Sequence, residues 1–452
     1  MRRNVLIACV LLTVVVIAAA VMALTAKRLE WTTSSPEALA EFQKGLGTSE
    51  KYYVAEARTH FARAAELDPN FIMAKYFLMR SIDSPSSDPA STRLLKAIEQ
   101  ADLAKLTDRE RFLLQYAGAG LKKDTAAAER ILSAYAAKKP DDPYALERQS
   151  GIATARQDWP EAHRLLMRLV EIAPNRVSAY NELGYLEMGQ GRFADAQKMF
   201  ETYRYIAPDQ ANPHDSLGEL FILLGRYDEA RKELEEALRI RPDFCDSYEH
   251  LVRLALMDGR VDEAKQALAR ADSASPCGDK SAMYKGMRCL IAVWPPLFVG
   301  DWEGMWRAQQ ASCGDMKRGE DPLQIWVALR TNRSAEADAV EKGARENLAM
   351  MLPSEPGRRY VEAFVAHIEG ARLLVGGEPA RAAERFRFAD QSMSYRGLPL
   401  GILKIINRVV LARALQASGA KEEAATVLAE ARAVNPKFVD RLSFIAVPPA
   451  SS

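Results

Sequence analysis

Residues 182–208 read ELGYLEMGQGRFADAQKMFETYRYIAP, and residues 216–242 read SLGELFILLGRYDEARKELEEALRIRP. The two stretches carry small residues, large apolar residues and a final proline at matching places. Three classes of position keep one fixed interval over four copies: Ala162, Ala196, Ala230 and Ala264; Leu166, Phe200, Leu234 and Leu268; Pro174, Pro208, Pro242 and Pro276. A fixed period of this length is typical of a stacked repeat array, so the periodicity decides the fold class.

Each period predicts two helices and two turns. Gly191, Gly225 and Gly259 recur in a Gly-Arg-apolar turn and predict a left-handed cap that ends the first helix. The proline that closes each period stops the second helix, because proline lacks an N–H and clashes with the preceding turn. Small residues such as Gly184 allow the two helices to approach closely, and Phe200 fills the space toward the next pair.

This 34-residue helix–turn–helix resembles the tetratricopeptide repeat. The same pattern extends back to Ala57–Pro69 and forward to Ala424–Pro436, with an insertion expected near Ser81–Ala90. We therefore expect an all-α chain, a right-handed superhelix (α-solenoid) of about eleven antiparallel helix pairs, preceded by one transmembrane helix. The resemblance implies a non-enzymatic scaffold whose concave face binds a protein or peptide.

Phe61 to Phe244 is similar to the repeat regions of bacterial signalling proteins. Three short motifs carry this likeness: Leu67-Asp68-Pro69-Asn70-Phe71, Leu106-Thr107-Asp108-Arg109-Glu110-Arg111 and Pro140-Asp141-Asp142-Pro143. In those proteins the array follows a kinase, cyclase or winged-helix output domain, and the sequence shows no such domain. Direct signalling output is therefore not expected.

The pattern predicts seven stretches along the chain. They are a short flank at 1–4, a transmembrane helix at 5–26, a linker at 27–36, a regular array at 37–278, divergent helical repeats at 279–353, C-terminal repeats at 354–438 and a tail at 439–452.

Val5 to Ala26 contains 22 residues without a charge. As a helix it reaches about 33 Å, enough for a bilayer core of about 30 Å. We expect an uncleaved anchor, because the apolar run is longer than a usual secretory core. A cleaved signal peptide ending at Val21-Met22-Ala23 is the alternative.

Arg2 and Arg3 before the span, against Lys27 and Arg28 with Glu30 after it, favour a cytoplasmic N-terminus slightly. The rest of the chain would then be periplasmic, on a bacterial inner membrane. A cytoplasmic-facing adaptor of a membrane complex is the alternative.

Composition and motifs exclude several classes of function. The formal net charge is +1, from 61 Lys and Arg against 60 Asp and Glu, so a nucleic-acid partner is not expected. No phosphate-binding loop, nucleophile elbow or His-Glu-x-x-His occurs. We expect no cofactor, metal or catalytic residue, and His214 and His250 are predicted to be surface or groove histidines. An enzyme site hidden in 280–353 is the least favoured alternative.

Four cysteines lie outside the apolar segment: Cys245, Cys277, Cys289 and Cys313. Without a Cys-x-x-Cys, a structural zinc site is not expected. Free, partly buried thiols are the main expectation. In a periplasmic protein, Cys277 and Cys313, which open two Cys-Gly-Asp motifs, form the alternative disulfide.

Four of the tryptophans, Trp294, Trp302, Trp306 and Trp326, lie close together in the sequence. Such a cluster is typical of either a binding hot spot or an irregular core, and we favour the core.

The concave face of the first helices is the candidate binding groove. In tetratricopeptide repeats the second and fifth positions typically supply ligand contacts, with the ninth position one turn later. Seven residues at the fifth and ninth positions are the candidates here: Glu147, Asn181, Tyr185, Asp215, Glu219, Glu249 and Arg253. Residues 143–276 hold 17 Lys and Arg against 23 Asp and Glu, a net charge of −6. We expect this groove to favour a basic or amide-rich ligand, the alternative being an ordinary solvated helix face.

Overall fold

A computed structural model describes residues 30–82, 89–274, 276–278, 281–314, 323–351, 355 and 357–442. Over these ranges the chain is helical and contains no strand. The chain divides into two compact units, Met1–Pro140 and Asp141–Ser452. None of the described helices is long and apolar enough to cross a bilayer, and the apolar segment Val5–Ala26 lies outside the described residues.

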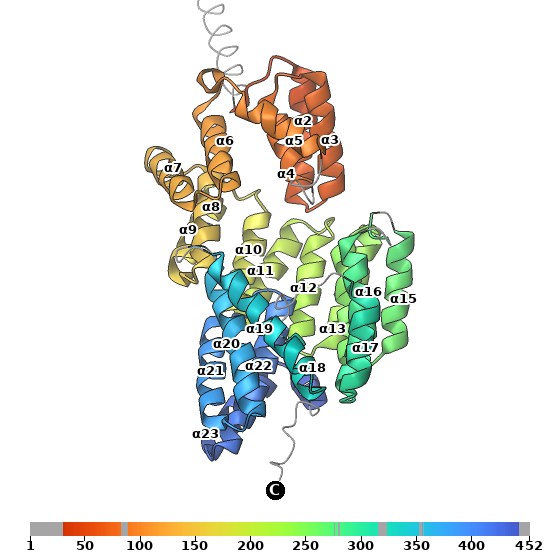
Figure 1. The fold of residues 1–452 in the computed structure, drawn as a ribbon. Coiled ribbons are helices and arrows are strands. Elements are labelled where there is room, and N and C mark those ends of the chain that lie inside the picture. Colours follow the sequence, from red (N-terminus) through yellow and green to blue (C-terminus); the bar gives the residue numbers. More distant parts are fainter. Residues whose placement is uncertain are drawn as a thin grey trace, which may run out of the picture. The chain divides into compact units, whose positions relative to one another are not determined.

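The N-terminal unit contains three helix pairs and a short 3₁₀ turn (Figure 1). Its helices are α2 (Pro36–Glu50), α3 (Val54–Leu67), α4 (Ile72–Arg80), α5 (Pro89–Glu99), η2 (Leu103–Lys105), α6 (Asp108–Leu121) and α7 (Thr125–Lys138). Ser35 caps α2, and Thr107 forms a capping box with Glu110 at the start of α6. The expected insertion near Ser81–Ala90 falls between α4 and α5, where residues 83–88 lie outside the described ranges.

The start of the described chain is fixed to this unit. Trp31 is 3% exposed and packs edge-on against Phe42, with ring centroids 5.1 Å apart. The buried Glu110 carboxylate accepts a hydrogen bond from the backbone N–H of Thr32 at 2.6 Å. The stretch 27–36, predicted to be a linker, is therefore packed where the structure describes it, from Glu30 onward.

The C-terminal unit contains the remaining pairs. Its helices are α8 (Pro143–Ala155), α9 (Trp159–Ile172), α10 (Ser178–Gly189), α11 (Phe193–Ile206), α12 (Asn212–Leu223), α13 (Tyr227–Ile240), α14 (Cys245–Asp258), α15 (Val261–Ser273), α16 (Ala282–Phe298), α17 (Trp302–Ser312), α18 (Gln324–Arg330), α19 (Ser334–Ala349), α20 (Arg358–Val375), α21 (Pro379–Ser392), α22 (Leu398–Ala417), α23 (Lys421–Val434) and α24 (Pro436–Arg441). Across the described residues, α2 to α23 form eleven successive pairs of contacting helices, the number that the sequence predicts.

The predicted close approach within each pair is confirmed. A Cβ atom added to Gly184 would lie 2.3 Å from the Phe200 ring, and one added to Gly218 would lie 2.7 Å from Leu234. Either added Cβ atom would force a neighbour to move, because the opposing atoms belong to the buried side chains of Phe200 and Leu234.

The predicted left-handed caps are also confirmed, with φ of 77° at Gly191, 70° at Gly225 and 84° at Gly259. Two earlier repeats reach the same conformation without glycine, at Lys123 and Gln157. Each of these five positions follows the previous one by a single repeat period. The backbone of the repeat therefore persists where its sequence signature has been lost.

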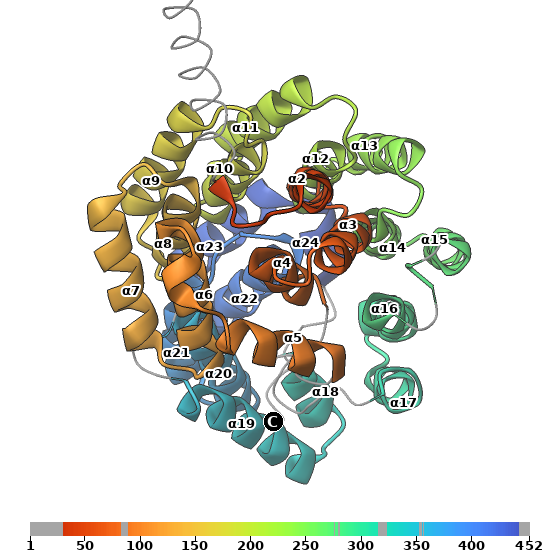
Figure 2. The same ribbon diagram turned by 90° about the horizontal axis from the view of Figure 1, so that it is seen from above.

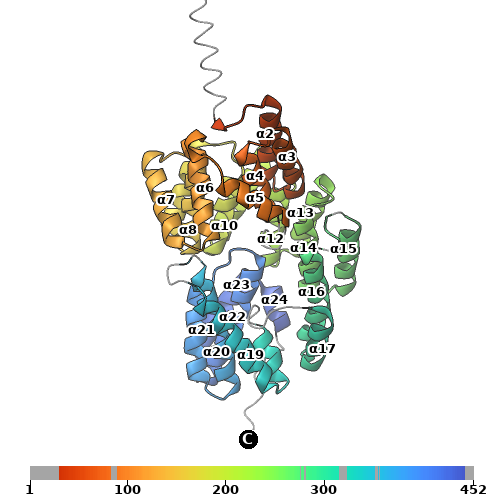
Figure 3. The same ribbon diagram turned by 45° about the horizontal axis from the view of Figure 1, so that its top comes forward.

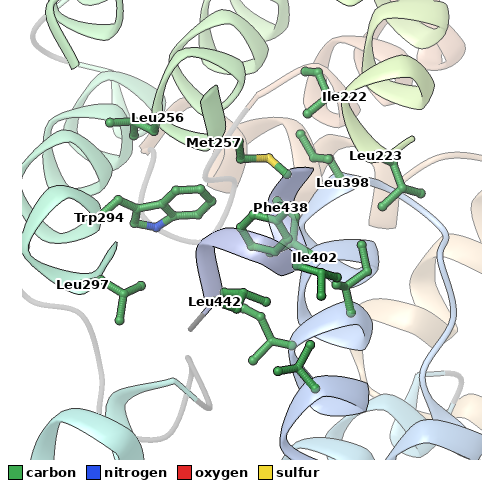
Figure 4. Packing of buried hydrophobic residues seen from close by; sticks show 14 of the residues in the cluster. Ile222, Leu223, Leu256, Met257, Trp294, Leu297, Leu398, Ile402, Phe438 and Leu442 are labelled. Carbon is green, nitrogen blue, oxygen red and sulfur yellow. The ribbon is translucent and has the colours of Figure 1, made fainter. Parts of the chain in front are cut away.

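Within the C-terminal unit, α8 to α17 follow a curved path (Figure 2), and α20 to α23 lie beyond one end of α8 and α10 (Figure 3). α22 contacts α12, and α24 contacts both α14 and α22. Phe438 of α24 packs among Met257, Trp294 and Ile402, so one hydrophobic core joins the central repeats to the last ones (Figure 4).

The tryptophan cluster is part of this core, as we favoured. Trp294 and Trp326 are buried, and Trp302 and Trp306 pack against the same core while remaining half-buried. Arg333 stacks over the Trp306 ring at 4.6 Å from its centroid.

The expectation of free thiols is wrong, and so is the Cys277–Cys313 pairing. The structure contains the disulfides Cys245–Cys277 and Cys289–Cys313. Cys277 lies over the preceding repeat, since its sulfur is 3.5 Å from the carbonyl oxygen of Asp243, two residues before Cys245. Cys289 and Cys313 are equally far in sequence from Asp301, so the hairpin of α16 and α17 brings them together. Stacking and hairpin geometry, rather than the shared Cys-Gly-Asp motif, determine the pairs.

Candidate functional site

The first helices of the central repeats, α10, α12 and α14, bring most of the predicted groove residues together. Asn181, Asp215 and Glu219 are only 3%, 3% and 5% exposed. The Ser216 hydroxyl donates a hydrogen bond to Asn181 at 2.8 Å, and the Ser247 hydroxyl donates one to Asp215 at 2.7 Å. Hydrogen bonds from side chain to side chain therefore cross from α10 to α12 and from α12 to α14.

His250 is the positive centre of this face. Its Nδ1 lies 3.0 Å from Asp215 Oδ1, and its Nε2 lies 3.7 Å from Glu219 and 3.9 Å from Glu249. Burial alone would lower the pKa of His250, but the carboxylates of Asp215, Glu219 and Glu249 raise it to about 10. The predicted surface or groove histidine is thus a buried imidazolium at neutral pH.

Tyr185 and Glu219 join α10 to α12. The Tyr185 hydroxyl donates a hydrogen bond to Glu219 Oε2. Burial, followed by the charges of Glu219 and Asp215, holds the pKa of Tyr185 well above its usual value, so the phenol remains a donor.

The remaining predicted residues lie at the edge of this face or apart from it. Glu249 pairs with Arg253 one turn later on α14, and both side chains are less than one-fifth exposed. Glu147 lies on α8 and pairs with Arg176 at 3.4 Å, away from the His250 cluster. Six of the seven predicted residues therefore gather on α10, α12 and α14, and Glu147 does not join them.

The chain itself covers part of this face. We call residues Ser392–Leu398, from the last residue of α21 to the first residue of α22, the return segment. The Tyr395 N–H donates to the carbonyl of Gly189 at 3.1 Å, and the Leu398 N–H donates to Glu219 Oε1. Gln157 donates to the Ser392 carbonyl at 2.6 Å. The return segment is thus hydrogen-bonded to three successive repeats.

Arg396 supplies the charge of the return segment. Its Nη2 donates to Glu182 Oε2 at 2.7 Å, and its guanidinium lies 5.6 Å from the centroid of the Tyr185 ring. The acidic face thus holds a basic side chain in an ion pair and a cation–π contact.

Sequence reasoning missed Glu182 and Arg396 and underrated His250. Glu182 follows Asn181 directly and could have been found by widening the set of repeat positions. Arg396 is 214 residues from Glu182, and no repeat position refers to it. Among the described residues, no three His, Cys, Asp or Glu side chains gather as a metal ion would require.

Sequence comparison agrees with the repeat geometry. Residues 175–243 and 221–277 match two models of the tetratricopeptide repeat. The chain contains tetratricopeptide repeats. As in such arrays generally, its helix pairs form a scaffold for protein–protein interaction. No curated protein sequence matches this chain.

Several solved structures are similar to it. One is a tetratricopeptide repeat protein from Parabacteroides merdae, with 14% identity, a TM-score of 0.38, and coverage of 60% of this chain and 97% of that chain. Another is pilF of Pseudomonas aeruginosa, with 16% identity, a TM-score of 0.31, and coverage of 55% and 96%. The APC/C hetero-tetramer Cut9–Hcn1 shows 14% identity, a TM-score of 0.47, and coverage of 90% and 76%.

Proposed function

We propose that this protein is a membrane-tethered scaffold that holds a partner through a basic segment bound to the first-helix face of the central repeats. The contact of Arg396 with Glu182 and Tyr185 carries the proposal, because it shows how that face accommodates an arginine. His250 balances only part of the carboxylate charge around it, so the face favours cations.

A partner's basic segment would compete with the return segment for Glu182 and Tyr185. The test uses the full chain in detergent and a fluorescent peptide, Ser-Tyr-Arg-Gly-Leu, which copies the return segment. Arg396→Ala should strengthen peptide binding several-fold, since it removes the internal competitor, and Glu182→Gln should weaken it.

Arg387→Ala is the matched control, because Arg387 also pairs with a glutamate but lies on α21, outside the return segment. Equal binding by the wild type, Arg396→Ala and Glu182→Gln chains would refute a basic ligand at this face.

We propose that the array faces the periplasm of a bacterial inner membrane, tethered by Val5–Ala26, with a role in envelope assembly or sensing. Two disulfides support this side, because disulfides persist in oxidising compartments and are rare in the cytosol. The same bonds make the cytoplasmic-facing adaptor the weaker alternative. A phosphatase fused after Ser452 should be active and a fluorescent protein fused there dark, and the reverse pattern would reject the periplasmic assignment.

A further inference from the structure

The last helices of the array enclose a groove of about 530 Å³ between α22, α23 and α24, which we call the end groove. It is separate from the first-helix face of the central repeats. Its floor is apolar and includes Val409, Ala412, Ala424 and Val439, all buried. Leu428, half-buried, extends the floor along α23.

The end groove lies where the repeat pattern would place another helix. α24 begins at Pro436, the proline that closes the repeat, and so occupies the start of a further first helix. It is six residues long, against twelve for α12 and fourteen for α14. Lys421 and Ala425 are exposed on α23, so among the described residues α24 covers only part of that helix.

Cations surround the apolar floor. Arg413, Lys421 and Arg432 line the end groove, against the single carboxylate of Asp440, which pairs with Arg432 at 3.0 Å. Burial and then the nearby Arg330 lower the pKa of Arg413 to about 10, so it still carries its charge at neutral pH. Its guanidinium donates a hydrogen bond to the Leu442 carbonyl at 3.1 Å and adds positive charge to the lining of the end groove.

Helix packing and charge together indicate the occupant. Ala412, Ala424 and Ala425 are small, so another helix can approach closely, as it does between the pairs of the array. The net charge of the lining side chains is positive, so carboxylates complement it. We propose that the end groove docks an acidic amphipathic helix of a partner protein, with its apolar row on the floor and its carboxylates against Arg413, Lys421 and Arg432.

The test measures fluorescence anisotropy of a labelled 14-residue helical peptide with the full chain in detergent. The peptide carries leucines at helical spacing flanked by glutamates, and a second peptide carries glutamines instead. We expect the glutamate peptide to bind, with an affinity that falls as salt rises. The Lys421→Glu, Arg432→Glu double variant should bind the glutamate peptide at least tenfold more weakly than the wild-type chain does. The wild-type chain should bind the glutamine peptide at least tenfold more weakly than the glutamate peptide.

Two further variants keep the result interpretable. Lys198→Glu with Lys232→Glu makes the same charge change on exposed positions of α11 and α13, and should bind like the wild type. Ala425→Trp fills the end groove from an exposed position and should abolish binding without disturbing the core.

Four outcomes would overturn the proposal. These are no binding of the glutamate peptide, equal binding by the reversed variant, binding only after residues 443–452 are removed, or a dimer that the reversed variant dissociates. The third would assign the end groove to the chain's own terminal residues, and the fourth to a second copy of the chain.

Discussion

His250 and His367 are both buried imidazoles, but their neighbours favour opposite protonation states. His250 lies among carboxylates, which raise its pKa to about 10. His367 Nε2 accepts a hydrogen bond from Trp326 Nε1 at 3.0 Å, and its Nδ1 lies 2.9 Å from Asn407 Oδ1. Because the Trp326 N–H donates to Nε2, that nitrogen carries no proton, and the proton on Nδ1 is donated to Asn407 Oδ1, so His367 is neutral. Burial lowers the pKa of His367 to about 4.

Replacing His250 should change how stability depends on alkaline pH. The folded pKa lies above the usual value of about 6.5, so the stabilisation is complete below pH 6.5 and is lost as pH rises through 10. His250→Gln should lose about 3 kcal/mol at pH 6, because three carboxylates lose their cation, and the loss should shrink toward pH 10.

Urea unfolding at pH 6, 8 and 10 measures this difference. His163→Gln is the control, since that side chain is 47% exposed beside Glu187. A loss from His250→Gln that stays constant across pH would contradict the charged state of His250.

Acid should affect the chain through His367. Its folded pKa lies below the usual value, so the unfolded chain binds more protons and stability falls as pH drops from about 6.5 to 4. Glutamine can accept from Trp326 and donate to Asn407 without titrating. We expect His367→Gln to lower the free energy of unfolding by about 1 kcal/mol at pH 7. Between pH 7 and 4 the variant should then lose less stability than the wild-type chain. Thermal melts of both chains between pH 7 and 4 measure this difference. If stability fell equally with pH in the variant and the wild type, His367 would not be the group that titrates.

At the scale of elements, the helix pairs depend on small residues at the crossing. A Cβ at position 218 would lie 2.7 Å from Leu234, whose side chain is fully buried. Gly218→Ala should therefore destabilise the chain by about 1–3 kcal/mol through overpacking. Gly286→Ala on α16 meets no atom within 4 Å and should instead be stabilising by about 0.4–1 kcal/mol. Chemical denaturation measures the free energy of unfolding of both variants. Equal changes would mean that the crossing of α12 and α13 can relax around the added methyl group.

The same crossings show why the pairs could be predicted from the sequence. Gly184 and Phe200 have the same separation along the chain as Gly218 and Leu234, because the turn between two helices has a fixed length. Such local contacts repeat, and their pattern identifies them. The return segment could not be predicted in this way. It lies on the central repeats because the array curves back, and that curvature results from small rotations summed over many pairs.

In the candidate site, too, contacts between equivalent repeat positions could be predicted from the sequence, and contacts outside the repeat pattern could not. The sequence could place Asn181 next to Asp215, and Tyr185 next to Glu219, because residues one repeat period apart occupy equivalent places on successive helices. Their burial could not be foreseen, since it depends on His250, Ser247 and Leu398 closing over them.

At the scale of the whole molecule, one disulfide joins the start of α14 to the residues that follow α15, and the other joins α16 to the end of α17. Cys245–Cys277 closes 32 residues and Cys289–Cys313 closes 24. Each restricts the unfolded chain, which stabilises the fold by about 2–4 kcal/mol in loops of this size. Peptide mass mapping without reductant should recover these two pairs and not Cys277–Cys313.

Reduction should therefore destabilise the wild-type chain more than a variant in which one of the two disulfides has been replaced by serines. We expect dithiothreitol to lower the urea midpoint of the wild type, and to lower it less in the Cys245→Ser, Cys277→Ser chain and in the Cys289→Ser, Cys313→Ser chain. The variant lacking all four thiols should not respond to reductant, which separates bond breakage from other effects of the reagent. The wild-type chain produced in a reducing cytosol should have the urea midpoint of the variant that lacks all four thiols, because its own thiols do not pair there. If the wild-type midpoint did not move on reduction, the links would add nothing to stability, and their support for a periplasmic location would rest on pairing alone.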